Sequence, residues 1–142
     1  MAFRAFLTIS LLLAATPAWA APSPGPTCPT NVGGRVVLTS DAVDPDVLVW
    51  DSRDQLVDFV AGHWGSTHMI VSHTVVAKPG TRATVVACYP GIAHPRNSPT
   101  PMDAIGVRVV NGQFRGRYGW VLSSDLHPDD PRTTTVPPQQ SK

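Results

Sequence analysis

The chain has 142 residues, in which 11 basic and 10 acidic side chains nearly cancel, and every acidic side chain is an aspartate. This balance gives no indication of a nucleic-acid partner, because binding to a polyanion depends on an excess of Lys and Arg. The length is that of one modest domain with tails.

The first twenty residues have the features of an export signal. Arg4 provides a short positive region, an uncharged apolar run extends from Phe6 to Ala15, and small residues occupy Ala18 and Ala20, where a signal peptidase selects them. We expect cleavage after about Ala20 and a mature protein that is secreted or periplasmic. No membrane span is expected, because the apolar run is shorter than the roughly 20 residues that a spanning helix needs.

Residues 21–32 are predicted to form an extended, Pro-rich arm. The arm contains Cys28, and the second cysteine of the chain is Cys88. Two cysteines in an exported chain predict one disulfide, which would pin the arm onto the sheet. The alternative is a pair of buried or reactive thiols, although no Cys-x-x-Cys spacing supports redox catalysis.

Residues Arg35 to Thr39 read as a first strand, whereas the apolar run from Val47 to Trp50 is too short to classify. Ser52 and Gln55 fit a capping box at the start of a helix, which we expect from about Arg53 to Ala61. The helix would pack on the sheet through three apolar residues, Leu56, Phe59 and Val60.

Two further strands are predicted on either side of a tight turn. Met69 to Ala77 and Thr81 to Tyr89 are apolar runs, and Lys78-Pro79-Gly80 between them has the composition of a turn with Pro at its second position. We expect the two strands to pair as a hairpin. Residues Pro90 to Met102, rich in Pro, would then be a long connection.

The strongest strand pattern follows this connection. Apolar residues alternate from Ile105 to Val110, with the period of a half-buried strand. Asn111 and Gly112 suit the turn that ends it, because both tolerate a positive φ. A second strand is predicted from Tyr118 to Leu122.

The pattern V-x-V-x-x-G-x-x-x-G-x-x-G-W-V, which runs from Val107 to Val121, precedes a predicted short helical turn at Ser123–Asp125 and a core residue, Leu126. It resembles the C-terminal half of bacterial SH3-like domains, and PGTRATVV at residues 79–86 resembles their opening strand. The resemblance covers about Val75 to Leu126 and implies a small β-barrel.

The whole pattern predicts a mainly β fold, a small SH3-like barrel of five to six short strands with one short N-terminal helix. This domain would occupy residues 33–128. The polar tail, residues 129–142, is predicted to be disordered.

Catalysis and metal binding are not favoured by the residue pattern. His63, His68 and His73 recur every five residues, which would put successive histidines on opposite faces of a strand. The chain contains no Glu and no Gly-x-Ser-x-Gly motif. We therefore predict no catalytic residues, no metal ligands and no cofactor, with a small secreted hydrolase or metal-dependent enzyme as the alternative.

Charge is unevenly distributed along the chain. Six aspartates fall between residues 41 and 58, whereas four arginines fall between residues 96 and 117. Such an asymmetry is able to orient a charged ligand, but a solvated surface is the favoured interpretation.

Aromatic and arginine side chains near the last turn are the remaining candidates for function. In SH3-like domains aromatic residues at such places line a ligand groove, and Arg is suited to holding a carboxylate. The predicted binding residues are Tyr89, Phe114, Arg115, Arg117 and Tyr118. Trp120 is either a core residue or part of this site.

These residues predict an exported, non-catalytic binding module. Its ligand would be an extracytoplasmic peptide or a cell-wall component. A structural partnership with another exported protein is an alternative that the residue pattern does not separate from ligand binding.

Overall fold

The computed structural model describes residues 28, 30–64 and 66–130. The predicted export signal, most of the Pro-rich arm and nearly all of the predicted tail therefore lie outside the described residues. The elements in chain order are β1 (Arg35–Leu38), β2 (Val47–Trp50), α1 (Arg53–Val60), α2 (Thr67–His73), β3 (Thr74–Ala77), β4 (Thr81–Ala93), β5 (Met102–Val109), β6 (Tyr118–Leu122), the 3₁₀ turn η1 (Ser123–Asp125) and β7 (Leu126–Pro128).

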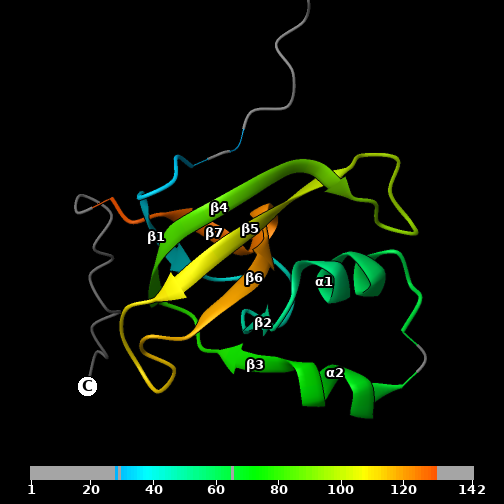
Figure 1. Ribbon diagram of the computed structural model, residues 1–142, viewed down its shortest axis with the longest axis horizontal. Helices are drawn as coiled ribbons and strands as arrows, with labels where there is room; N and C mark the ends of the chain where they lie inside the picture. The colour runs from blue at the N-terminus through cyan, green and yellow to red at the C-terminus, as the bar shows by residue number, and fades with distance from the viewer. Residues whose placement is uncertain (1–27, 29, 65, 131–142) are drawn as a thin grey trace, which may run out of the picture.

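The seven strands form one antiparallel sheet in the order β3-β2-β6-β5-β4-β1-β7, and the two α-helices lie together beside it (Figure 1). The prediction of a mainly β, barrel-like fold is confirmed. The prediction of five to six strands with one short helix is wrong, since the described residues form seven strands and two short α-helices. The helix predicted from about Arg53 to Ala61 is present as α1. Within the described part of the chain, no helix is both long enough and apolar enough to cross a membrane.

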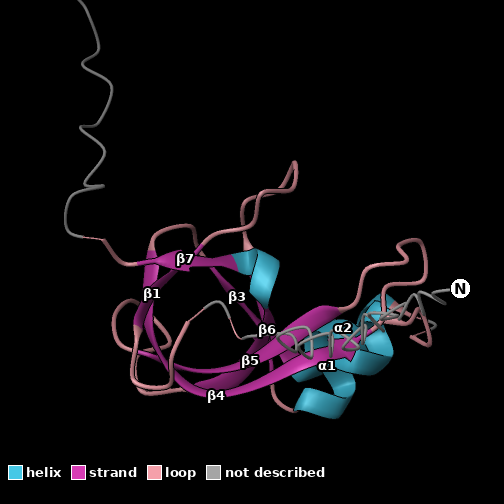
Figure 2. Ribbon diagram, turned by 90° about the horizontal axis from the view of Figure 1, so that it is seen from above, coloured by secondary structure: helices cyan, strands magenta, loops and turns pink. Residues whose placement is uncertain are grey.

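The sheet curls into a half-barrel (Figure 2). Strands β3 and β4 are separated by three other strands in the sheet, yet only residues 78–80 connect them. In a flat sheet they would lie about 19 Å apart, whereas the connection reaches at most about 14 Å. The short connection therefore requires the sheet to bend round.

Apolar side chains form two clusters, one on each face of this sheet. The inner cluster fills the curl and includes Val49, Val107 and Val121. The outer cluster is built on Trp50 and Ala104 and is covered by α1 through Leu56, which is buried, with Phe59 and Val60 partly buried beside it. The predicted packing of this helix is confirmed, and it lies on the outer face.

The start of α1 follows half of the predicted capping box. The Ser52 hydroxyl accepts a hydrogen bond from the Gln55 amide at 3.2 Å, as expected for an N-cap. The Gln55 side chain does not reach back to residue 52. Its Nε2 lies 3.0 Å from His73 Nδ1, so it connects the helix to the end of α2.

The prediction of one strand from Met69 to Ala77 is wrong in its first half. Strand β3 pairs residue for residue with β2, from Thr74 opposite Trp50 to Ala77 opposite Val47. Because β2 has only four residues, the preceding segment finds no partner strand, and its backbone groups bond within helix α2 instead. The Thr74 hydroxyl donates to the Ile70 carbonyl at 2.8 Å where the helix ends.

The predicted hairpin between these two strands is also wrong. The Lys78–Gly80 turn forms, with the Thr81 amide donating to the Lys78 carbonyl at 3.0 Å. Strand β4 pairs with β1 and β5, however, and β3 pairs only with β2. The turn therefore closes the curl of the sheet and is not a hairpin turn.

Strand β4 is longer than predicted. It continues to Ala93 and pairs there with Met102, so the connection to β5 spans only residues 94–101. A register shift between Tyr89 and Ala93 accommodates Pro90 and Gly91, because a bulge leaves residues outside the regular ladder. The predictions for β1, β5, β6, η1 and a buried Leu126 are confirmed.

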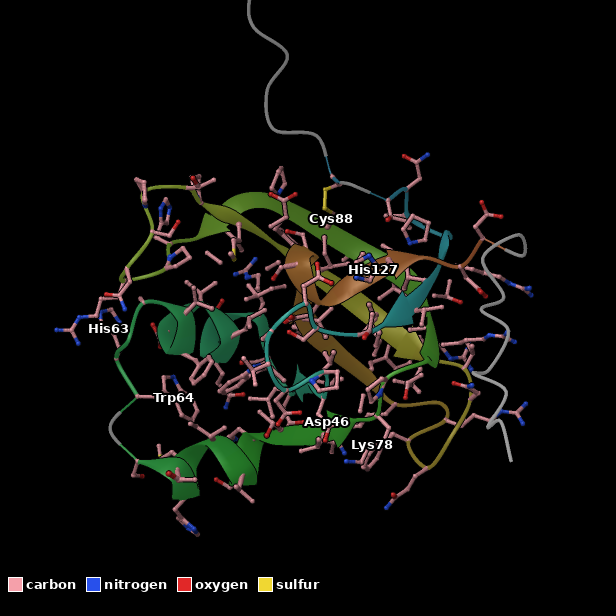
Figure 3. The ribbon with its side chains drawn as sticks, turned by 180° about the vertical axis from the view of Figure 1, so that it is seen from behind. Asp46, His63, Trp64, Lys78, Cys88 and His127 are labelled. Carbon is pink, nitrogen blue, oxygen red and sulfur yellow. A yellow bond between two sulfur atoms is a disulfide. The ribbon has the colours of Figure 1, made fainter. Side chains whose placement is uncertain are left out.

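The disulfide between Cys28 and Cys88 is present, with a Cα–Cα distance of 6.2 Å. Cys88 lies on β4, where its sulfur bond is visible in Figure 3. The residues that follow Cys28 also bond to this strand. The Gly33 amide donates to the Val85 carbonyl at 2.7 Å, and the Val85 amide donates to the Gly34 carbonyl at 2.9 Å. The start of the domain is therefore fixed across β4, as predicted.

Candidate functional site

Three aromatic side chains share the outer face of the sheet at its centre. Trp120 on β6 lies opposite Gly106 of β5, and Tyr118 lies two residues away on the same strand. Tyr89 on β4 lies opposite Ala104. Residues directly opposite each other, and residues two apart, point to one face of a sheet. We call Tyr118, Trp120 and Tyr89 the aromatic strip.

Gly106 allows the indole of Trp120 to lie across the sheet. A β-carbon at this glycine would be 3.3 Å from two ring carbons of Trp120 and 3.1 Å from the β-carbon of Ala87. No larger residue fits without moving one of these neighbours. The indole therefore covers the β5 backbone and reaches the ring of Tyr89, with ring centroids 5.6 Å apart.

Tyr89 is also contacted by an arginine from helix α1. The guanidinium carbon of Arg53 lies 4.7 Å from the centroid of the Tyr89 ring, within the range of a cation–π contact. Nε and Nη2 of Arg53 donate to one carboxylate oxygen of Asp54, at 3.0 and 2.9 Å. These hydrogen bonds and the charge of Asp54 raise the pKa of Arg53.

Tyr118 extends the strip at its other end. It is 60% exposed, and Arg108 lies over its ring at 5.6 Å from the centroid. Tyr89 is 42% exposed, whereas Trp120 is partly buried and packs against the outer cluster. The sequence left open whether Trp120 is a core residue or part of the surface. In the structure it is both, since it packs against the outer cluster and belongs to the strip.

The other predicted site residues are placed differently. Arg117 forms an ion pair with Asp51, which follows β2. Phe114 and Arg115 belong to the turn between β5 and β6, and their backbone hydrogen bonds stay within it: the Arg117 amide donates to the Phe114 carbonyl and the Arg115 amide to Gly112. Phe114 is half-buried, and Arg115 is exposed. Within the described residues, no ring or ion-pair contact joins either side chain to Tyr89.

An open pocket of about 380 Å³ lies beside the strip. Its walls are α1 and the far end of β4, with Val57 and Ile92 as apolar residues and Asp58 as a charged one. Arg53 and Asp54 also line it, so the pocket begins where the strip ends. A ligand lying on the aromatic rings is able to continue into this pocket past the guanidinium.

Sequence reasoning missed Arg53 and Arg108 as members of this surface. For Arg108 a signal existed, because its position in the alternating strand puts it on the face opposite Val107 and Val109. For Arg53 there was none. Its contact with Tyr89 depends on how the helix packs on the sheet.

The three histidines are not gathered into a metal site. His63 follows α1, as Figure 3 shows, and His68 and His73 lie on α2. His73 meets Gln55 and lies edge-on to Trp64, with ring centroids 5.7 Å apart. Among the residues that the structure describes, no group of three or more His, Cys, Asp or Glu side chains is arranged to hold a metal ion.

Comparison with known proteins finds no match for this chain. The chain matches no protein-family model, and searches of curated proteins and of solved structures find no match.

Proposed function

We propose that this protein is an exported, non-catalytic binding module of SH3-like type, which holds an extracytoplasmic peptide or cell-wall component on the aromatic strip. The observation that carries the proposal is the continuous arrangement of Arg53, Tyr89 and Trp120, with Tyr118 and Arg108 extending it. The disulfide supports the exported location, because disulfides persist in oxidising compartments.

The chemistry of the strip suits such a ligand. Aromatic rings offer flat apolar faces with polar edges, which pack on peptide groups and on the apolar faces of sugars. Arginine binds carboxylates through paired hydrogen bonds, and wall peptides and extended peptides both carry carboxylates. The rings need little reordering on binding, since Trp120 is already held on Gly106 and Tyr89 already contacts both Trp120 and Arg53.

The test is retention of the purified protein on isolated cell-wall fragments. Tyr89→Ala and Tyr118→Ala each remove an exposed ring of the strip, and we expect each to weaken retention about five- to tenfold. Val110→Ala is the control, because Val110 is 41% exposed but does not belong to the strip.

Phe114→Ala and Arg115→Ala separate the strip from the adjacent turn. Loss of retention in the strip variants alone places the ligand on the strip, whereas loss in the turn variants alone would move the site to the turn. If the unchanged protein is not retained, or if all the variants are retained equally, the proposed function is wrong.

A further inference from the structure

A second hollow lies on the outer face and is lined by residues other than those of the aromatic strip. It has a volume of about 350 Å³ and lies where α1 and η1 meet β2 and the loop that precedes it. Its floor is apolar and belongs to the outer cluster: Leu48, Trp50, Leu56, Phe59 and Leu122. We call it the acidic groove, because aspartates surround this apolar floor.

Three carboxylates stand on this rim. Asp44 and Asp46 come from the β1–β2 loop, and Asp125 comes from η1. Lys78 pairs with Asp46, with Nζ 2.6 Å from its carboxylate, and Figure 3 shows these two side chains side by side. The charge of Lys78 also interacts with Asp44. Within the described residues, neither Asp44 nor Asp125 forms an ion pair. The three carboxylates on the rim therefore outnumber the one lysine that pairs with them, and the groove keeps a net negative charge.

Of Asp44 and Asp125, Asp125 is the less solvated carboxylate. Burial raises its pKa, and hydrogen bonds from the Ser40 side chain and the Leu122 backbone oppose the rise without cancelling it. The nearby charge of Asp41 raises it further. A carboxylate in such a place gains more from an added cation than one in open water does, since the field of the cation is screened less.

We propose that the acidic groove binds the side chain of a lysine residue carried by a partner peptide. Four methylene groups would lie over the floor at Trp50, and the ammonium would lie between Asp44 and Asp125. Lysine side chains commonly bury their stems along apolar surface while the charged end keeps polar contacts. This site shares no residue with the aromatic strip, so it is independent of the function proposed above.

The probe is a blocked tripeptide, acetyl-Gly-Lys-Gly-amide, titrated into the ¹⁵N-labelled full chain and followed by NMR. We expect shifts of amide signals in residues 40–48 and 122–126, with a Kd on the order of millimolar for so small a ligand. The matched peptide has norleucine in place of lysine, which keeps the stem and removes the charge. It should bind at least about tenfold more weakly, because hydrogen bonds to charged groups are the stronger ones.

Three variants locate the site. Asp44→Asn and Asp125→Asn should each weaken binding of the lysine peptide about tenfold. Ala42→Phe should abolish it by filling the groove from an exposed position, and it leaves every carboxylate in place. Asp58→Asn is the control, since it removes the same charge from α1 but does not line the groove.

Equal binding of the lysine and norleucine peptides would overturn the proposal. So would shifts that persist unchanged in both Asp44→Asn and Ala42→Phe, whose positions are exposed and do not depend on the partly buried Asp125.

Discussion

Gly106 determines how the aromatic strip is built at the scale of single residues. The sheet has no side chain at this position, and the indole of Trp120 occupies the space. A similar restriction applies at Gly119, where a β-carbon would clash with the Val49 side chain and lie 2.8 Å from the Trp50 carbonyl oxygen. The two glycines act on opposite faces, so only Gly106 bears on the strip.

We predict that Gly106→Ala displaces Trp120 while leaving the protein folded. The added methyl group overpacks the space between Ala87 and the indole, which typically costs about 1–3 kcal/mol. The indole N–H signal of Trp120, assigned by its absence from Trp120→Phe, should shift in the ¹H–¹⁵N spectrum, and retention on wall fragments should fall. A lower melting temperature with an unmoved Trp120 signal would contradict the role given to this glycine.

Asp125 predicts a dependence of stability on pH. Burial raises its pKa in the folded state, so the native protein binds more protons than the unfolded chain between the ordinary and the raised pKa. The contribution of Asp125 to the free energy of unfolding therefore decreases as the pH rises through that window and is constant above it. Urea unfolding from about pH 3 to pH 6 should show the wild type losing stability relative to Asp125→Asn as the pH rises. A wild type that gains relative to the variant would reverse the assigned sign.

At the scale of elements, the two helices begin in similar ways but differ in what holds their first turn. Ser52 and Ser66 are the N-cap residues of α1 and α2, and both have extended backbone angles. The Ser52 hydroxyl caps its helix, whereas Ser66 makes no side-chain cap hydrogen bond. Of the two helices, only α1 has a buried residue, Leu56, which packs on the sheet.

The two serines provide a matched pair of variants. Ser52→Ala removes the cap of α1 and should lower the free energy of unfolding by about 1 kcal/mol. Ser66→Ala removes no such bond and should change it by less than about 0.5 kcal/mol. Urea unfolding of both variants at one pH measures the difference. Equal losses would show that the hydroxyl of Ser52 does not stabilise α1.

On the scale of the whole molecule, β4 connects the parts of the fold. It pairs with β1 on one side and β5 on the other, and it carries both the disulfide and Tyr89. The disulfide joins residues 60 positions apart in the sequence, so it closes a long loop in the unfolded chain. The segment after Cys28 is held by this bond and by the backbone pairing of Gly33 and Gly34 with Val85.

Reduction of the disulfide should therefore lower the melting temperature. A closed loop of this length removes conformational entropy from the unfolded chain worth about 4 kcal/mol in the chain-entropy model. For a domain of this size that corresponds to a fall on the order of 10 °C or more, measured by thermal unfolding with and without a reductant. The double variant Cys28→Ser, Cys88→Ser should melt at the reduced temperature and should not respond to the reductant. An unchanged melting temperature on reduction would contradict the prediction.

The local pattern of the chain determined the strands whose pairing is local. The alternation around Val107, the turn at Gly112 and the Gly-Trp-Val segment at residues 119–121 lie within one hairpin, so near neighbours in the sequence suffice to define β5, β6 and η1. The helix α1 is similar, since its cap and its apolar face both lie within ten residues. The cysteine pair was predictable because the chain has only two.

Tertiary structure alone decided the elements and contacts whose partners are distant in the sequence. Residues 67–73 form a helix because β2 has only four residues, all of which pair with β3. The turn at Lys78–Gly80 closes the half-barrel because β4 pairs with β1 and β5 and not with β3. The contact of Arg53 with Tyr89 and the rim of Asp44 and Asp125 around an apolar floor likewise arise from packing between separate elements. The sequence by itself determined a mainly β, barrel-like domain with one disulfide and an aromatic surface near the last hairpin. Which side chains from separate elements meet on a face followed only from the tertiary structure, because strand order and helix docking depend on contacts that periodicity does not encode.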